Sequence, residues 1–267
     1  MNPESEQECQ VPEGPPIYAN WVAANAGCPV LYTEEFPLFT DSHITGEVAY
    51  GPYEFLNAVP ELQSGQAKPC VILRCSGHVE WPSPDMRKTS ADRYHGGSFQ
   101  EEIAALTSLA MGVRFRAGNS TRRFEPGGDP RGRPIERGSR RMAPTLIREL
   151  HFRWRLPSAV EGEHSLDSLE ILSRLPTLRP DLAVSLVRAA RLYQDSLWLI
   201  ESEPSLAWLM LVSAVETAAN PWQTEKGDPL DRMRESRPEL TDYLERIGPE
   251  VAVQVATQIA DSLGTSK

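Results

Sequence analysis

The sequence predicts an α+β protein in which a mixed α/β N-terminal region with a few strands precedes a C-terminal helical bundle. Runs of β-branched and aromatic residues bounded by Gly and Pro occur in residues 30–160. After residue 165, apolar residues recur at spacings of three and four, which is the period of a helix. The 267 residues are enough for one large domain or two ordinary ones, and 40% apolar residues support a packed core.

The first 29 residues differ in composition from the rest of the chain. Residues 1–29 are rich in Pro, Gly, Glu and Gln, so we expect a disordered tail. Residues 30–160 form the predicted mixed α/β domain. Its first element is a short edge strand or an extended segment over residues 30–40, because Pro37 has no N–H to donate to a neighbouring strand. Residues 49–62 are expected to hold a helical turn.

Two further elements of this domain have strong local signals. The β-branched and apolar run Val71-Ile72-Leu73 predicts a strand over residues 69–79. Residues 98–113 predict a mostly buried helix. Ser98 is expected to cap it, and Glu101 stands three residues later, which is the capping-box pattern.

The end of the predicted mixed domain is basic. A connection rich in Gly, Pro and Arg covers residues 117–144. Residues 150–156 then alternate between apolar and polar, which predicts a half-buried strand. The polar side chains of this strand are those of His151, Arg153 and Arg155, so its outer face is expected to be basic.

Residues 165–267 make up the predicted helical domain. A short helix over residues 165–175 precedes two long helices over residues 180–200 and 205–220. The second long helix is apolar nearly all round from Leu206 to Val215, which is typical of the central helix of a bundle. The first has one apolar stripe, which consists of Leu182, Leu186, Ala189, Tyr193, Leu197 and Ile200. Two shorter helices are predicted at 238–247 and 249–263.

Charge is unevenly distributed along the chain. The net charge is -10, and 23 of the 27 basic residues are Arg. Residues 112–155 hold 12 Arg against four acids, which makes this segment +8 within an otherwise acidic chain. The overall balance argues against a protein that coats nucleic acid generally. The basic segment is the part of the chain where an anion can be held.

Arginines of the basic region are therefore the candidate nucleic-acid-binding residues, since the guanidinium fork matches phosphate geometry. The segment matches neither a Walker loop nor a dinucleotide fingerprint. These arginines can equally pair with the acidic remainder of the chain or with a partner. The candidates are Arg122, Arg123, Arg131, Arg133, Arg140, Arg141, Arg153 and Arg155.

Metal, cofactor and membrane sites are not indicated. Cys70 and Cys75 are separated by four residues without a matching second pair, which is poor spacing for zinc, so we expect the four cysteines to be small buried thiols. We expect no cofactor. No apolar run approaches a membrane span, and the N-terminus lacks the features of a signal peptide, so a soluble cytoplasmic protein is expected.

The helix pair in residues 180–220 has a first helix with an Arg-rich centre, a short turn, and an apolar helix that ends in Ala-Val-Glu-Thr. The pattern RAARLYQDSLWLIESEPSLAWLMLVSAVETAAN resembles the HEPN superfamily, in particular the bacterial Apea-like HEPN group. The resemblance covers residues 180–264 and implies a HEPN-like helical bundle that dimerises. Many HEPN proteins are ribonucleases of toxin or antiphage defence systems, and others only bind RNA or nucleotides.

The catalytic signature of that family is an Arg and a following His with four to six residues between them, so that the Arg stands five to seven positions upstream of the His. None of the five histidines of this chain has an Arg at that distance upstream, and the chain stops before the position that the resemblance implies for the motif. We therefore expect a non-catalytic or truncated HEPN-like protein that binds RNA or a protein partner, in bacterial stress or antiphage defence. The bundle is expected to form a homodimer or to bind that partner.

Two alternatives remain open. One is a ribonuclease that uses the Arg-rich region, with Glu216, His151 and Arg153 as candidate catalytic residues. Glu216 is the acid that the resemblance assigns to the second helix, and it can instead pair with Arg188 or Arg191 of the neighbouring helix. The other alternative is a protein-assembly module without nucleic-acid binding.

Overall fold

The computed structural model describes residues 14–57, 61–63, 66–68, 70–80, 98–126, 128, 134–137, 162–223 and 229–265. Strands precede a helical C-terminal part, so the α+β class is confirmed. The chain divides into two compact units, Met1–Ala218 and Ala219–Lys267, and each is described by itself. The division falls inside the helical domain that was predicted over residues 165–267.

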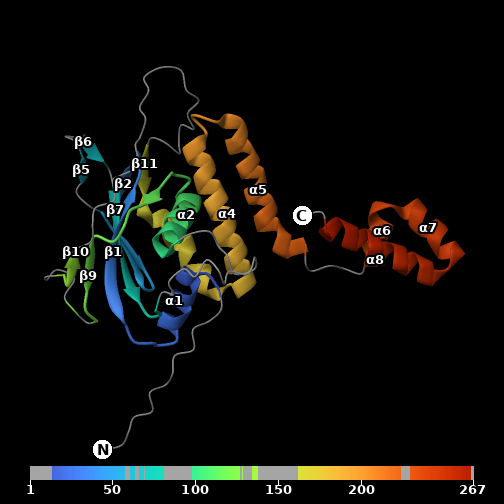
Figure 1. Ribbon diagram of the computed structural model, residues 1–267, viewed down its shortest axis with the longest axis horizontal. Helices are drawn as coiled ribbons and strands as arrows, with labels where there is room; N and C mark the ends of the chain where they lie inside the picture. Colours follow the sequence, from blue (N-terminus) through green and yellow to red (C-terminus); the bar gives the residue numbers. More distant parts are fainter. Residues whose placement is uncertain are drawn as a thin grey trace, which may run out of the picture. The chain divides into compact units, whose positions relative to one another are not determined.

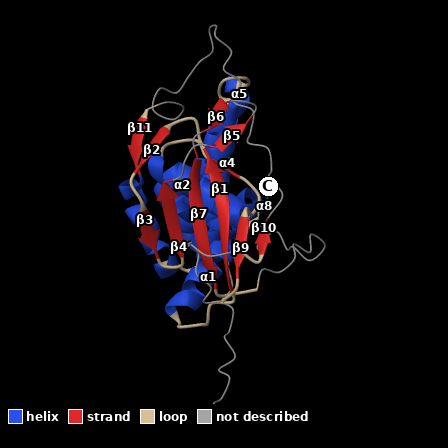
Figure 2. Cartoon of the chain, turned by 90° about the vertical axis from the view of Figure 1, so that its left-hand side faces the viewer, coloured by secondary structure: helices blue, strands red, loops and turns tan. Residues whose placement is uncertain are grey.

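A seven-stranded antiparallel sheet forms the framework of the first unit (Figure 2). Its strand order is β10-β9-β1-β7-β4-β3, and β8 also pairs with β1. The strands are β1 (Tyr32–Phe39), β3 (Val48–Tyr50), β4 (Tyr53–Asn57), β7 (Cys70–Gly77), β8 (Arg116–Ala117), β9 (Arg122–Phe124) and β10 (Glu136–Arg137). Strands β9 and β10 and the end of β8 therefore lie in the described part of the segment that was predicted as a connection.

Four further strands form two small pairs outside this sheet. Strands β2 (His43–Thr45) and β11 (Glu163–Ser165) pair in parallel, and β5 (Glu61–Gln63) pairs with β6 (Gln66–Lys68) antiparallel.

Strand β1 lies in the interior of the sheet, so the prediction of an edge strand was wrong. It pairs with β7 along its whole length and with β8 and β9 on its other side. Pro37 is tolerated there because its missing N–H faces the break between β8 and β9. The carbonyl oxygen of Pro37, on that same side, accepts a hydrogen bond from the N–H of Gly118 in the break, at 2.7 Å.

Strand β4 occupies the place of the predicted helical turn. Tyr53 and Phe55 are fully buried, while the intervening Glu54 is half-buried, which is the period of a strand. A tight turn joins β4 to β3 at Gly51, whose φ is 55°. A side chain at this position would also collide with the indole of Trp21, so glycine is required for two reasons.

Helices cover one face of the sheet and enclose the main core (Figure 2). They are α1 (Pro16–Asn25), α2 (Phe99–Met111), the 3₁₀ helix η1 (Leu166–Thr177) and α4 (Pro180–Leu199). The largest fully buried side chains of this unit are those of Ile17, Leu38, Tyr53, Phe55, Leu73, Ile103, Leu106, Phe115, Phe124, Leu166, Leu169 and Leu197.

Helix α1 contradicts the expectation of a disordered tail for residues 14–29. Ile17, Tyr18 and Trp21 are buried against the sheet, and the Trp21 ring meets the Tyr53 ring edge-on at 5.3 Å. The Tyr53 hydroxyl donates to the carbonyl of Ile17 at 2.8 Å. The N–H of Ile17 donates to the buried carboxylate of Glu102 at 3.2 Å, which suits the start of a helix. The average composition of residues 1–29 concealed these contacts.

The capping box of α2 is confirmed. Ser98 and Glu101 bond reciprocally, with the Ser98 N–H donating to Oε2 of Glu101 at 3.0 Å. Gly112 ends the helix in the left-handed conformation, with φ 67°.

Helix α4 packs alongside α2 in the first unit (Figure 1), so it is part of the sheet domain and not of a separate bundle. The buried face of α4 is formed by small and medium side chains, because α2 presents Ala104 and Ala105 to the same core. Most of the predicted stripe is only half-buried: Leu182, Leu186, Tyr193 and Ile200. The buried residues include Ala183, Val187, Ala190, Gln194 and Leu197.

Among its described residues, the second unit contains the helices α6 (Pro229–Ser236), α7 (Pro238–Ile247) and α8 (Pro249–Thr265). The two helices predicted at 238–247 and 249–263 are confirmed. The described buried side chains of this unit are those of Met233, Thr241, Ala252 and Ala256. An ion pair at 2.7 Å between Arg234 and Glu245 joins α6 to α7.

Candidate functional site

A row of alternating charges crosses four neighbouring strands on the sheet. Arg122 on β9, Glu35 on β1, Arg74 on β7 and Glu54 on β4 occupy directly opposed positions. The carboxylate of Glu35 is 2.6 Å from Nε of Arg122 and 3.0 Å from Nη2 of Arg74. Arg74 also pairs with Glu54 at 2.9 Å. The row therefore links strands that are distant in the sequence.

Glu35 is buried, and a buried carboxylate requires compensating partners. Arg122 donates to both of its oxygens, and Arg74 donates a further hydrogen bond. Arg122 was a candidate nucleic-acid-binding residue. In the structure its Nε and Nη2 groups are occupied by Glu35, which gives this arginine a role in strand pairing.

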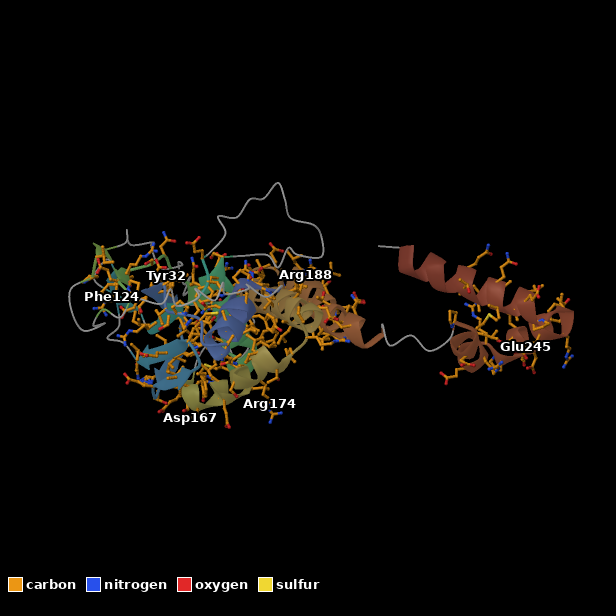
Figure 3. All side chains as sticks on the ribbon, turned by 90° about the horizontal axis from the view of Figure 1, so that it is seen from below. Tyr32, Phe124, Asp167, Arg174, Arg188 and Glu245 are labelled. Carbon is orange, nitrogen blue, oxygen red and sulfur yellow. The ribbon has the colours of Figure 1, made fainter. Side chains whose placement is uncertain are left out.

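Arg123 is exposed, and its guanidinium lies over the ring of Tyr32 at 4.9 Å. The guanidinium of Arg122 lies 5.3 Å from the Phe124 ring. Figure 3 labels Tyr32 and Phe124 at one end of the first unit. Burial raises the pKa of Tyr32, so this phenol is neutral beside Arg123.

The remaining candidates of the basic region lie outside the described residues, as does the strand predicted over residues 150–156. The roles predicted for these residues, nucleic-acid binding for the arginines and catalysis for His151 and Arg153, stay predictions. These residues are His151, Arg131, Arg133, Arg140, Arg141, Arg153 and Arg155.

Glu216 is exposed on α5 (Pro204–Gln223), and within the described part of the chain it makes no ion pair. Arg191, one of its expected partners, lies 3.7 Å from Glu101 on α2. Arg191 of α4 faces α2 because the two helices pack together. His151 and Arg153 lie outside the described residues, so a catalytic site that they share with Glu216 stays a prediction.

The apolar face of α5 is exposed, so the prediction of a buried central helix was wrong. Val215, Trp208 and Leu209 are 70%, 68% and 62% exposed, and Leu206 and Val212 are also exposed. Trp208, Val212 and Val215 are spaced by four and three residues and therefore form one stripe. Ala207 and Ala214, which are buried, lie on the opposite side of the part of α5 whose side chains are described.

This apolar face, which consists of Leu206, Trp208, Leu209, Val212 and Val215, is nearly free of charge. Glu216 is the only charged residue in α5. An exposed row of large apolar side chains is unfavourable in water and marks a surface that another element covers. The apolar run from Leu206 to Val215 was visible in the sequence. It did not predict an exposed face, because burial in a helical bundle explains the same run equally well.

Two cysteines behave differently from each other. Cys75 is a free and fully buried thiol, as expected, and burial raises its pKa well above the ordinary value. Cys28 is disulfide-bonded, which contradicts the expectation of free thiols throughout. The described residues contain no cluster of His, Cys, Asp and Glu that could hold a metal ion. Among the helices in the described part of the chain, none has the length and apolarity of a membrane span.

Comparison of the chain with protein-family models, with curated proteins and with solved structures gives no match.

Proposed function

We propose that this chain is an assembly protein that forms a homodimer through the apolar face of α5. The observation that carries the proposal is the exposure of this face, which holds Trp208 and four aliphatic side chains on one helix. Covering such a face with another apolar surface is worth roughly 1.5–3 kcal/mol for each large side chain. The HEPN resemblance of residues 180–264 also implies a dimer.

A second copy is favoured as the occupant by the chemistry of the face. Homodimer interfaces are more apolar than other interfaces, and charged residues are depleted from their centres. The five residues of the face carry no charge that would select an acidic or basic partner, and Glu216 follows Val212 by four residues at the C-terminal end of the face.

The spacing of the face also suits two-fold packing. In an antiparallel pair of α5 helices with the axis near Val212, Trp208 of one copy lies opposite Val215 of the other. A large side chain then meets a smaller one at both ends of the stripe, which allows close packing.

Sedimentation velocity of the full chain tests the proposal. We expect a dimer for the wild type and a monomer for Val215→Glu, with a dissociation constant at least about 100-fold higher, because burying an unpaired carboxylate costs several kcal/mol. Ile171→Glu is the matched control, since Ile171 on η1 is 64% exposed and lies outside the face. It should remain dimeric.

A wild-type chain that stays monomeric up to about 0.1 mM would contradict the proposal. So would a Val215→Glu variant that dimerises as tightly as the wild type. Circular dichroism of each variant checks that the fold is retained.

RNA binding by the basic region has less support from the described residues. Arg122 is engaged by Glu35, and Arg74 is shared between Glu35 and Glu54. A binding constant for labelled RNA that falls steeply as the salt concentration rises would establish RNA binding independently of dimerisation.

A further inference from the structure

One buried arginine connects the sheet to the turn from which α5 departs. The Arg114 side chain is 5% exposed and lies just before β8. Its Nε donates to both oxygens of Asp41, at 3.0 and 3.1 Å, and its Nη2 donates to Asp41 as well. Its Nη1 faces Glu201 at 3.4 Å and the carbonyl of Leu197 at 3.5 Å.

The last turns of α4 are held by the same segment. The indole N–H of Trp198 donates to the carbonyl of Phe115 at 3.0 Å, and the side-chain amide of Gln194 donates to that carbonyl at 2.8 Å. The guanidinium of Arg114 lies 4.7 Å from the centre of the Trp198 ring. The end of α4 is therefore rigidly attached to residues 114–116.

Helix α5 is supported differently from α4. In its described part the buried side chains are the small ones of Ala207 and Ala214, while Trp208, Leu209 and Val215 are more than 60% exposed. In Figure 1 the two helices diverge from their common turn. The direction of α5 therefore depends on how the turn between α4 and α5 is held.

That turn is held by two kinds of contact. The backbone N–H groups of Ser202 and Glu203 donate to the carbonyl of Leu199 at 3.0 and 2.7 Å, which closes the turn on itself. The second contact is the ion pair between Glu201, which lies in the turn, and Arg114, which lies next to the sheet.

The two carboxylates are not equivalent in this cluster. Asp41 accepts from both the Nε and Nη2 groups of Arg114, whereas Glu201 has one contact at 3.4 Å. Glu201 is thus the more weakly held partner. If its contact is lost, Arg114 keeps Asp41 and remains neutralised, so releasing Glu201 leaves no unpaired buried charge.

We propose that Asp41, Arg114 and Glu201 form an ionic latch that sets the direction of α5. The latch presents the apolar face at one angle to the rest of the unit and so favours one geometry of association. Glu201 is a positioning residue in this arrangement. The consequence for association rests on the proposed homodimer, whereas the direction of α5 is a property of the single chain.

The experiment measures the direction of α5 within one chain. Nitroxide labels are attached through unnatural amino acids at Ile171 on η1 and Ala218 on α5, and the labelled protein is diluted with excess unlabelled protein. Both positions are exposed. Pulsed dipolar spectroscopy then gives the distribution of the distance between them, whether or not the chain dimerises.

We expect a narrow distribution for the wild type and a broader one, by about a factor of two in width, for Glu201→Gln. Glu203→Gln is the matched control, because Glu203 is exposed in the same turn and its described side chain has no ion pair. It should reproduce the wild-type width. A Glu201→Gln protein as narrow as the wild type overturns the latch, and so does a Glu203→Gln protein that broadens equally.

A second readout separates the latch from the proposed homodimer. Glu201→Gln should raise the dissociation constant of the dimer about tenfold, while Glu203→Gln leaves it unchanged. Broadening of the distance in a chain that never dimerises would retain the latch and overturn the proposed function. Broadening with an unchanged dissociation constant would overturn the role of the latch in association.

Discussion

Glu35 on β1 lies directly opposite Arg122 on β9, and its two carboxylate oxygens accept hydrogen bonds from that guanidinium at 2.6 and 2.9 Å. Arg74 completes the pairing from β7 on the other side. A buried carboxylate held between two guanidinium groups gives β1 a charged centre that only one strand register satisfies.

Removing the charge of Glu35 should destabilise the fold. Glu35→Gln leaves the guanidinium groups of Arg74 and Arg122 without their shared carboxylate, and we expect a loss of about 3 kcal/mol in the free energy of unfolding. Urea denaturation followed by circular dichroism measures it. Thr33→Val on the same strand is a control that keeps the row of charges intact. A loss below about 0.5 kcal/mol for Glu35→Gln would contradict a structural role for the row.

Arg122 and Arg123 are adjacent, but their replacement by Ala should change the free energy of unfolding by different amounts. Arg122→Ala is expected to lower the free energy of unfolding by about 1–3 kcal/mol, because Glu35 is left with one partner. Arg123→Ala removes an exposed contact with the Tyr32 ring, so we expect a loss of less than about 1 kcal/mol. Equal effects of the two substitutions in thermal and urea denaturation would show that the pairing with Glu35 contributes little.

Small side chains between α2 and α4 should be required for a stable fold. Ala190 is fully buried in the core shared with α2, so Ala190→Leu is expected to cost at least about 1–3 kcal/mol through overpacking. Ala218→Leu on α5 adds the same volume at an exposed position and should be nearly neutral. Denaturation of the two variants under one set of conditions gives the comparison, and a neutral Ala190→Leu would argue against this packing.

The homodimer predicts a specific cross-link. In the antiparallel arrangement Val212 lies near the two-fold axis, so two copies of Val212→Cys approach within disulfide distance. Mild oxidation should give a covalent dimer on a non-reducing gel. Ile171→Cys and the wild type, treated in the same way, control for other cysteines and should give little dimer. Equal cross-linking of all three proteins would reject the arrangement.

Stability should decline at alkaline pH through Cys75. Burial raises the pKa of this thiol, and burial also raises the pKa of Tyr53 next to it. The protonated thiol of Cys75 therefore contributes to the free energy of unfolding. This contribution is fully present below the ordinary thiol pKa of about 8.5. It is lost as pH rises above that value, because only the unfolded chain then releases the proton.

Cys75→Ala should flatten the pH dependence of the free energy of unfolding between pH values of about 8.5 and 10. The wild type should lose up to about 1.4 kcal/mol per pH unit more than the variant over that range. Parallel curves for the two proteins would show that Cys75 ionises as readily in the folded chain as in the unfolded one.

Local signals predicted several elements correctly. The capping box of Ser98 and Glu101 located α2, and the run Val71-Ile72-Leu73 located β7, because both depend on neighbouring residues. The central position of β1 could not be predicted in this way. Pro37 is acceptable there only because the break between β8 and β9, about 80 residues later in the chain, faces it.

Local patterns in the chain were sufficient to predict the α+β class, most of the helices and the long apolar run of α5, since periodicity and capping are local properties. Where those elements are buried depends on tertiary contacts. These contacts placed α4 against α2, brought Glu35 between two arginines, and left the apolar face of α5 exposed. The same apolar run suits a core helix and an interface helix, because burial depends on partners that the local pattern does not specify.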